Sequence, residues 1–364
     1  LIRLWGDDWK EKWLEAGIGY MKGMGFTGTG NWTDRYFIEK SSFPYVYPMA
    51  GFPSTKLSVF RDFPDVFDPT FAESATQYAA QLIPIKDDPR MIGYFLGNEP
   101  HWAFGNYNLA REMLYTMQKT KTRTEMANWL LDKYENIEAL NRVWGVSLKS
   151  IDEFERLTFQ RDEEISDGAW KDMETFTNKM IQTYAQVICD AVKKADPNHL
   201  NLGLRFAWIS SEACLTTGQY FDVFSLNGYT YPDPPDTKRI LDELNMPVLV
   251  GEFHFGSTDR GLPATGIQGV ASQKERGVAY RRYVEQGFAR PEIIGMHYFQ
   301  WNDQPVTGRF DGENYNIGIV DVTFRPYPEL SKAIRKTNSR LFKVASGKLR
   351  PYSRRAKLVP AIYY

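Results

Sequence analysis

The chain has 364 residues, 43% of them hydrophobic, which is enough apolar side chain for the large core of one α/β barrel. Its formal net charge of −1 gives no electrostatic reason to expect nucleic acid or an anionic membrane surface as a partner. No apolar run approaches the roughly 18 residues that a membrane-spanning helix needs.

Cysteine and histidine are too sparse and too scattered to predict a disulfide framework or a metal site. Of the two cysteines, Cys189 falls inside a helical pattern, where we expect a buried free thiol. No two of the four histidines have the spacing of helical metal ligands. The glycines at 23, 25 and 28 match a dinucleotide motif, but they follow a helix instead of preceding one. The sequence therefore predicts neither metal nor cofactor.

The first hundred residues predict alternating helices and strands. Apolar residues recur at helical spacing over 7–24 and 72–85. Short strands are expected at 25–31 and 45–48, and a longer apolar strand runs through 91–99. Helix and strand in alternation indicate a parallel sheet covered by helices.

The segment from about 103 to 199 is too long for a single barrel helix. Its pattern predicts one amphipathic helix over 124–145, ended by Gly145, and a second over 170–195. No linker rich in proline or serine flanks the segment. We therefore interpret it as a helical excursion between the fourth and fifth strands, with the insertion proper at about 103–170.

The rest of the chain completes an α/β pattern that we interpret as a (β/α)₈ TIM barrel. Further strands are expected at 200–205, 223–227, 247–252 and 293–299, and helices over 236–244 and 271–289. Counting backwards, the first barrel strand would lie before residue 1. We expect residues 1–342 to form the catalytic barrel. Residues 343–364 contain six Lys or Arg and no acid. We expect them to form a basic C-terminal tail that either lies on the surface or is frayed.

Two apolar segments end in a glutamate, Glu99 after 91–98 and Glu252 after 246–251. Such runs, bounded by Gly or Pro, are typical of strands buried on both faces. Burying an unpaired carboxylate at the end of such a strand costs free energy, so its presence there indicates a function. The active site of a barrel lies at the carboxyl ends of its strands. Two glutamates on separate strands therefore predict the carboxylate pair of a glycosidase.

Each glutamate also has a purely structural interpretation. Glu99 precedes Pro100 and could cap the next helix. Glu252 could form a buried salt bridge, for example with Arg205; this agrees with catalysis, because a nearby arginine lowers the pKa of a nucleophilic carboxylate. Asn98 favours the catalytic interpretation, because an amide beside the acid can hold a sugar 2-hydroxyl.

Other polar and aromatic residues at strand ends are candidates for binding substrate. Tyr229 could orient Glu252 or pack in an aromatic core, and Trp301 is expected to form the floor under the sugar that is cleaved. Asn31 lies in a formal glycosylation sequon, but its place at the barrel mouth favours a substrate contact. The predicted substrate-binding residues are Asn31, Trp32, Asn98, His101, Arg205, Asn227, Tyr229, His254, Trp301, Asp303 and Gln304.

These residues resemble a known group of enzymes, the clan of retaining (β/α)₈ glycosidases. The stretch 129–145 is similar to a segment of family 42 β-galactosidases. GNWTD at 30–34, GNEPHW at 97–102, GEFHFG with DRG at 251–261 and DQPVTGRFDGENYNIG at 303–318 together resemble glycoside hydrolase family 50, the exo-acting β-agarases.

This resemblance implies hydrolysis of β-1,4-linked D-galactose in agarose with retention, releasing neoagarobiose. It implies Glu99 as acid/base and Glu252 as nucleophile, and a polymer substrate implies a secreted or periplasmic bacterial enzyme. The first strand and the N-terminal carbohydrate-binding-type domain usual in that family are expected to be missing from this chain. Three alternatives stay open: a β-galactosidase, a hydrolase of porphyran or carrageenan, and a non-catalytic sugar-binding protein. The sequence leaves the oligomeric state open.

Overall fold

The computed structural model describes residues 1–363, which divide into two compact units. Unit 1 comprises Leu1–Pro48, Pro89–Gly93 and Val223–Tyr364, and unit 2 comprises Met49–Asp88 and Tyr94–Asp222. No helix in the described part of the chain is long and apolar enough to span a membrane.

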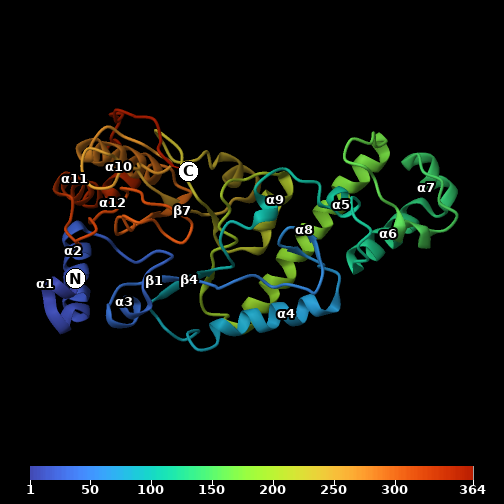
Figure 1. The fold of residues 1–364 in the computed structure, drawn as a ribbon, viewed down its shortest axis with the longest axis horizontal. Helices are drawn as coiled ribbons and strands as arrows, with labels where there is room; N and C mark the ends of the chain where they lie inside the picture. Colours follow the sequence, from blue (N-terminus) through green and yellow to red (C-terminus); the bar gives the residue numbers. More distant parts are fainter. Residues whose placement is uncertain (364) are drawn as a thin grey trace. The chain divides into compact units, whose positions relative to one another are not determined.

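Unit 1 holds a parallel sheet and the helices that pack against it (Figure 1). Its strands are β1 (Tyr45–Pro48), β6 (Phe224–Leu226), β7 (Val248–Phe253) and β8 (Ile293–Tyr298). Its helices are α1 (Ile2–Trp5), η1 (Gly6–Asp8), α2 (Trp9–Met24), α3 (Arg35–Lys40), the π-helix η6 (Ile240–Leu244), α10 (Gln273–Phe288), α11 (Pro328–Asn338) and α12 (Leu341–Ala345).

The parallel sheet of unit 1 has the order β6-β7-β8. Every residue of β7 is buried, as expected for a strand covered on both faces. Leu249 of β7 lies opposite Ser225 of β6 on one side and Gly295 of β8 on the other. Because the carboxyl ends of parallel strands meet at one edge, Glu252 lies at the edge where the segments after β6 and β8 also begin.

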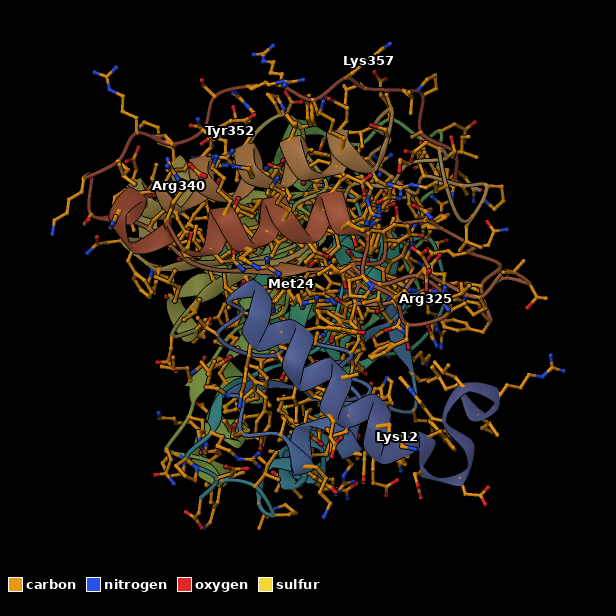
Figure 2. The ribbon with its side chains drawn as sticks, turned by 90° about the vertical axis from the view of Figure 1, so that its left-hand side faces the viewer. Lys12, Met24, Arg325, Arg340, Tyr352 and Lys357 are labelled. Carbon is orange, nitrogen blue, oxygen red and sulfur yellow. The ribbon has the colours of Figure 1, made fainter. Side chains whose placement is uncertain are left out.

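Helices α10 and α11 pack together in unit 1, and the end of α2 is fastened to α11 (Figure 2). Asn338 donates a hydrogen bond to the carbonyl of Met24 at 3.0 Å. As predicted, α2 ends at a glycine, Gly25, in the left-handed conformation that closes a helix without steric cost (φ 75°).

The basic C-terminal segment lies along unit 1, running past Tyr352 and Lys357 (Figure 2). The backbone N–H of Lys357 donates to Glu275 of α10 at 2.7 Å, and that of Val359 to the carbonyl of Gly269 at 3.1 Å. These bonds hold the segment on the surface. The division into 1–342 and 343–364 stays a prediction.

Unit 2 is mostly helical. Its strands are β2 (Ser58–Phe60), β3 (Phe63–Pro64) and β5 (Leu200–Asn201), while β4 (Met91–Phe95) begins in unit 1 and ends in unit 2. Its helices are α4 (Pro69–Ala79), η2 (Ala80–Leu82), η3 (His101–Ala103), α5 (Leu109–Met113), α6 (Lys121–Tyr134), α7 (Ile137–Trp144), η4 (Ile151–Arg156), α8 (Asp167–Ala195), α9 (Glu212–Thr216) and η5 (Thr217–Tyr220).

Helices α4 and α8 form the main packed pair of unit 2 (Figure 1). Phe71 of α4 stacks on Tyr184 of α8 with ring centroids 5.8 Å apart. The strand expected at 200–205 is shorter than predicted, but its pairing continues: Leu202 donates to the carbonyl of Tyr94 at 2.9 Å.

The single helix expected over 124–145 is wrong, because two helices, α6 and α7, occupy this segment. Glu135 adopts a left-handed conformation (φ 63°) that ends α6. The Asn136 side chain then accepts a hydrogen bond from the N–H of Ala139 and starts α7. A capping asparagine competes with helix continuation, which outweighs the continuous amphipathic pattern. The predicted stop at Gly145 is confirmed.

A fully buried guanidinium, that of Arg276 on α10, ties the carboxyl edge of the sheet to the loop 303–318. It carries five hydrogen bonds, and no carboxylate is among their acceptors. The acceptors are the carbonyls of Phe255 at 2.6 Å, Ile317 at 2.6 Å and Gly318 at 2.7 Å, Oε1 of Gln273 at 2.8 Å and the hydroxyl of Tyr298 at 3.0 Å. Removing this donor would leave several buried acceptors without partners.

We therefore expect Arg276→Met to lower the free energy of unfolding by about 3 kcal/mol or more, since each orphaned buried acceptor costs about 1–3 kcal/mol. Urea unfolding followed by tryptophan fluorescence measures this. Lys274→Met, at an exposed position of the same helix, is the matched control and should change stability by less than about 0.5 kcal/mol. Equal losses for both variants would contradict the role assigned to Arg276.

Candidate active site

Glu252, near the end of β7, is 7% exposed, and two predicted site residues hold its carboxylate. The indole Nε1–H of Trp32 donates to Oε1 at 2.9 Å, and the hydroxyl of Tyr229 donates to Oε2. Hydrogen bonds to a charged carboxylate are stronger than neutral ones and fix its orientation. Unit 1 thus brings together three predicted site residues, Trp32, Tyr229 and Glu252.

His254 packs on Tyr229 and is 1% exposed, so its ring has almost no surface for a ligand. The two ring centroids are 4.7 Å apart, and Nε2 accepts a hydrogen bond from the N–H of Ile267 at 3.0 Å. Burial, and then the charge of Arg276, lowers the pKa of His254 to about 3. A neutral His254 therefore supports Tyr229 from within the protein.

Asn31 has an unused amide beside Trp32. Asn31 is 7% exposed, and neither Oδ1 nor Nδ2 of its side chain has a hydrogen-bond partner among residues 1–363. An unsatisfied buried polar group costs about 1–3 kcal/mol, so such a group at a site indicates a ligand that completes it. Asn227 is also buried, and Trp301 is half-buried with its ring edge-to-face against Phe26, 6.1 Å between centroids.

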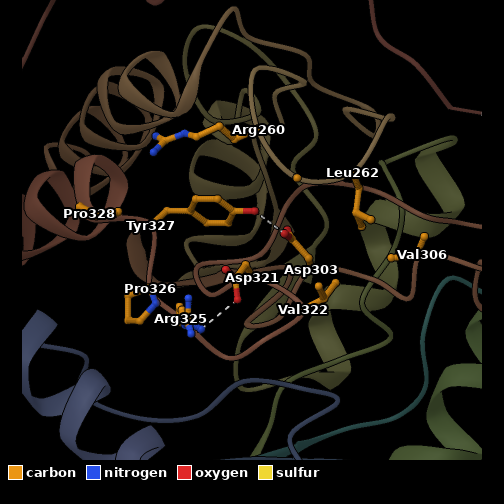
Figure 3. Close-up of a pocket in the computed structure, with 11 residues that line it drawn as sticks. Arg260, Leu262, Asp303, Val306, Asp321, Val322, Arg325, Pro326, Tyr327 and Pro328 are labelled. Carbon is orange, nitrogen blue, oxygen red and sulfur yellow. Dashed lines mark hydrogen bonds between the residues drawn. The ribbon is translucent and has the colours of Figure 1, made fainter. Parts of the chain in front are cut away.

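Asp303 and Gln304 hold the loop 303–318 together. The carboxylate of Asp303 accepts from the N–H of Gly318 at 2.7 Å and the hydroxyl of Tyr327 at 2.6 Å. It points toward Tyr327 at a pocket of about 430 Å³ (Figure 3), and burial raises its pKa. Gln304 accepts from the N–H of Tyr315 at 2.7 Å. The hydrogen bonds of both side chains lie within the loop and its neighbours.

Sequence analysis missed Glu313 on the same loop. This half-buried carboxyl pairs with Arg309 at 2.7 Å and accepts a hydrogen bond from Gln304. Burial raises its pKa, Gln304 and Arg309 oppose that rise, and the charges of Asp311 and Glu252 add to it. The charge of Glu252 therefore acts on the carboxyl of Glu313, which makes Glu313 a further candidate for the site. Its position in a loop carries no strand or helix periodicity by which the sequence could have identified it.

In unit 2, Glu99 follows β4 in a segment of unusual backbone geometry. Glu99 is half-buried with φ 48°, and its N–H donates to the carbonyl of Arg205 at 3.1 Å. The guanidinium of Arg205 donates to Oδ1 of Asn98. Gly97 has φ 147°, and a Cβ there would lie 2.2 Å from the Phe52 ring, so only glycine fits. The structure thus joins three predicted residues, Asn98, Glu99 and Arg205.

The helix-capping interpretation of Glu99 is wrong. The N-cap position of η3 is Pro100, and no side chain bonds there in the manner of a cap. Asp62 takes that role instead, accepting from the N–H groups of His101 at 2.8 Å and Trp102 at 2.9 Å. His101 itself is exposed. A carboxylate from a distant loop, that of Asp62, thus satisfies the first turn of η3.

Left-handed backbone is concentrated at the predicted site. Within residues 1–363, seven non-glycine residues have positive φ, and three of them are predicted site residues: Trp32 (53°), Glu99 (48°) and Arg205 (51°). Such conformations cost about 1–3 kcal/mol each and persist where function or packing demands them. Glu252 belongs to unit 1 and Arg205 and Glu99 to unit 2, so a salt bridge between Glu252 and Arg205 stays a prediction.

The described part of the chain contains free thiols but no cluster of potential metal ligands. No group of three or more His, Cys, Asp or Glu side chains there is arranged to hold a metal ion. Cys189 and Cys214 are buried free thiols, as expected for Cys189.

Comparison with known proteins shows the family. The family model of glycoside hydrolase family 42, described as beta-galactosidase, matches residues 67–323, more than half of the chain. The chain belongs to this glycosidase family. Beta-agarase B of Vibrio sp. (strain JT0107) is 36% identical over 349 residues, which cover 91% of this chain and 36% of the agarase.

Solved structures of glycosidases have the same fold. An exo-beta-agarase superposes with a TM-score of 0.85 at 32% identity over 95% of this chain and 49% of its own. PfGH50B superposes with a TM-score of 0.83 at 31% identity over 93% of this chain and 51% of its own. The resemblance to family 50 agarases and the class of TIM-barrel glycosidases are confirmed. The chain spans about a third to a half of the length of these relatives.

Because the pKa of His254 is lowered to about 3, folding disfavours its protonated form. The unfolded chain takes up this proton below about pH 6.5, so the free energy of unfolding falls as pH falls. Between pH 6.5 and 5.0 the wild type should lose about 1.6 kcal/mol more than His254→Gln, because the slope rises from about half of 1.36 kcal/mol per pH unit at pH 6.5 to nearly the full value at pH 5.0. Urea unfolding at both pH values measures this. His101→Gln, at an exposed histidine, should keep the wild-type slope, and equal slopes for all three proteins would refute the assignment.

Proposed function

We propose that this protein is a retaining glycoside hydrolase that cleaves β-1,4-galactosidic bonds of agarose or neoagaro-oligosaccharides. The observation that carries the proposal is the buried carboxylate of Glu252, held at a strand end by Trp32 and Tyr229. Kinship to Beta-agarase B and to an exo-beta-agarase supports agarose as the substrate and an exo-acting mode that releases neoagarobiose. An extracellular polymer as substrate supports a secreted or periplasmic location.

In the proposed mechanism, Glu252 is the nucleophile and Glu99 the acid/base. A Glu252 oxygen attacks the anomeric carbon while Glu99 donates its proton to the glycosidic oxygen, whose bond to that carbon breaks. Glu99 then takes a proton from water, the water oxygen bonds to the anomeric carbon, and the carboxylate of Glu252 leaves. Retention by this route requires the two carboxyl groups to lie about 5–5.5 Å apart.

The donors around Glu252 suit this role. Trp32 and Tyr229 bond different carboxylate oxygens, so the group is held in one orientation before substrate binds. Both donors are neutral side chains. His254 keeps Tyr229 in place and stays neutral over the working pH range.

Two amides are proposed to bind sugar hydroxyls. Arg205 bonds Oδ1 of Asn98, which directs the Nδ2–H donors of Asn98 to a 2-hydroxyl beside Glu99. The unused amide of Asn31 offers both a donor and an acceptor near the nucleophile. We include His101, Asn227 and Trp301 as further contacts. Asp303 and Gln304 are proposed to act on substrate binding indirectly, by holding the loop 303–318 in place.

The finer description of the fold is also part of this proposal. We assign β4 and β7 as the fourth and seventh barrel strands, with Glu99 shortly after β4 and Glu252 near the carboxyl end of β7. The helices α5, α6 and α7 then lie in the excursion between the fourth and fifth strands.

Chemical rescue tests the roles of the two glutamates. Glu252→Ala should lose hydrolysis by roughly a thousandfold or more and regain turnover with azide, forming an α-glycosyl azide, because azide fills the space of the nucleophile. Glu99→Ala with azide should form the β-product, because Glu252 still makes the covalent intermediate. Products are identified by NMR of the anomeric proton. An α-product from Glu99→Ala would show that the roles are reversed.

A β-galactosidase is the second candidate, favoured by the description of the matching family model. Incubation with agarose, neoagarohexaose and lactose, followed by chromatographic sizing of the products, separates the two. We expect neoagarobiose from agarose and from neoagarohexaose, and at least a hundredfold lower rate on lactose. Galactose release from lactose with agarose left intact would establish the β-galactosidase instead.

A further inference from the structure

Trp208, on the loop after β5, is a large aromatic side chain left 47% exposed in unit 2. An exposed indole by itself needs no explanation, because single apolar residues are common on protein surfaces. Its surroundings distinguish it. The loop that carries Trp208 is joined to the segment that carries Glu99 by hydrogen bonds of Arg205 and by ring contacts.

The indole of Trp208 is braced by a second aromatic ring. Phe104, just after η3, makes a T-shaped contact with Trp208, with ring centroids 5.2 Å apart and an interplanar angle of 80°. The ring of His101 makes a T-shaped contact with Phe104 in turn, at 6.1 Å. A T-shaped contact covers at most one face of the indole and restrains its rotation. The result is an immobilised ring with nearly half of its surface open.

The loops on which these rings lie are joined beside Glu99. The N–H of Glu99 donates to the carbonyl of Arg205 at 3.1 Å, and Arg205 bonds the side chain of Asn98. Below them, buried Trp102 contacts Phe206 edge-to-face, 6.4 Å between centroids. Trp208 follows Phe206 by two residues. The contacts of Phe206 with Trp102 and of Trp208 with Phe104 together fix the position of Trp208 relative to the segment that carries Glu99.

The exposed face suits a neutral sugar ring. The axial C–H groups of a galactose unit form an apolar face that packs on a flat aromatic ring and loses water on contact. The neighbouring rings Phe104 and His101 carry no fixed negative charge. A general acid lies beside the glycosidic oxygen that it protonates, so groups around Glu99 contact the leaving-group side of the substrate.

We propose that Trp208, braced by Phe104, is a stacking platform for a sugar unit on the leaving-group side of the cleaved bond. The assignment to that side rests on the proposed role of Glu99 as acid/base; sugar binding at Trp208 does not. The platform binds neutral β-galactan oligosaccharides, and its contribution grows when the oligosaccharide extends past the cleavage point.

Binding to Glu252→Ala, which leaves the oligosaccharide intact, tests the platform by calorimetry with neoagarobiose and neoagarohexaose. Adding Trp208→Ala should raise the dissociation constant for neoagarohexaose roughly tenfold and leave that for neoagarobiose within about twofold. Trp208→Tyr keeps an aromatic face and should stay within about threefold. Trp170→Ala removes another exposed tryptophan of unit 2 (38% exposed) and should change neither constant.

With native Glu252, Trp208→Ala should raise KM for neoagarohexaose about tenfold while kcat changes less than threefold. An unchanged dissociation constant for Trp208→Ala, or an equal change for Trp170→Ala, overturns the platform. Loss of hexaose binding at Trp208 in a protein that hydrolyses no galactan would uphold the platform and refute the proposed function. Normal hydrolysis with unchanged binding would refute the platform alone.

Discussion

The buried guanidinium of Arg276 is the interaction on which the carboxyl edge of unit 1 depends. It joins the segment after β7 at Phe255, β8 at Tyr298 and the loop 303–318 through acceptors that are all neutral. The charge of this buried cation also acts on His254 and, after burial, helps to lower the pKa of that ring, so that it stays neutral. Neutral His254 packs on Tyr229, which donates to Glu252. The charge and hydrogen bonds of Arg276 therefore hold the loop 303–318 and favour the neutral form of His254, whose ring packs on the tyrosine that bonds Glu252.

The two proposed catalytic carboxyls are supported in different ways. Glu252 sits in a regular, fully buried strand and receives its donors from two other segments of unit 1. Glu99 sits in strained backbone whose geometry requires Gly97 and is held through Arg205. A nucleophile needs a fixed orientation, which hydrogen bonds to both oxygens provide. An acid/base has to reach both the glycosidic oxygen and the attacking water in order to donate and accept a proton. A carboxyl on an irregular segment, outside the hydrogen-bonded strands, can point toward these atoms.

Some buried strands were predictable, because they are apolar runs with clear ends, but the strand expected at 25–31 is wrong: Thr29 forms only an isolated bridge with Tyr45. Those expected at 45–48 and 247–252 agree closely with β1 and β7. Errors arose where a single polar side chain outweighed a pattern. Asn136 divided the helix expected over 124–145, and Asp62, from another loop, took the capping role considered for Glu99.

The sequence by itself determined which residue types stand at the ends of the buried strands, because apolar periodicity and turn residues act locally. It therefore identified Glu99, Glu252 and Tyr229 as candidates. Only the tertiary structure decided which side chains meet. Trp32 bonds Glu252 across 220 residues, whereas Asp303 and Gln304 turn into their own loop and His254 packs under Tyr229. Hydrogen-bond partners are set by distant segments brought together in packing, and no local pattern records that distance.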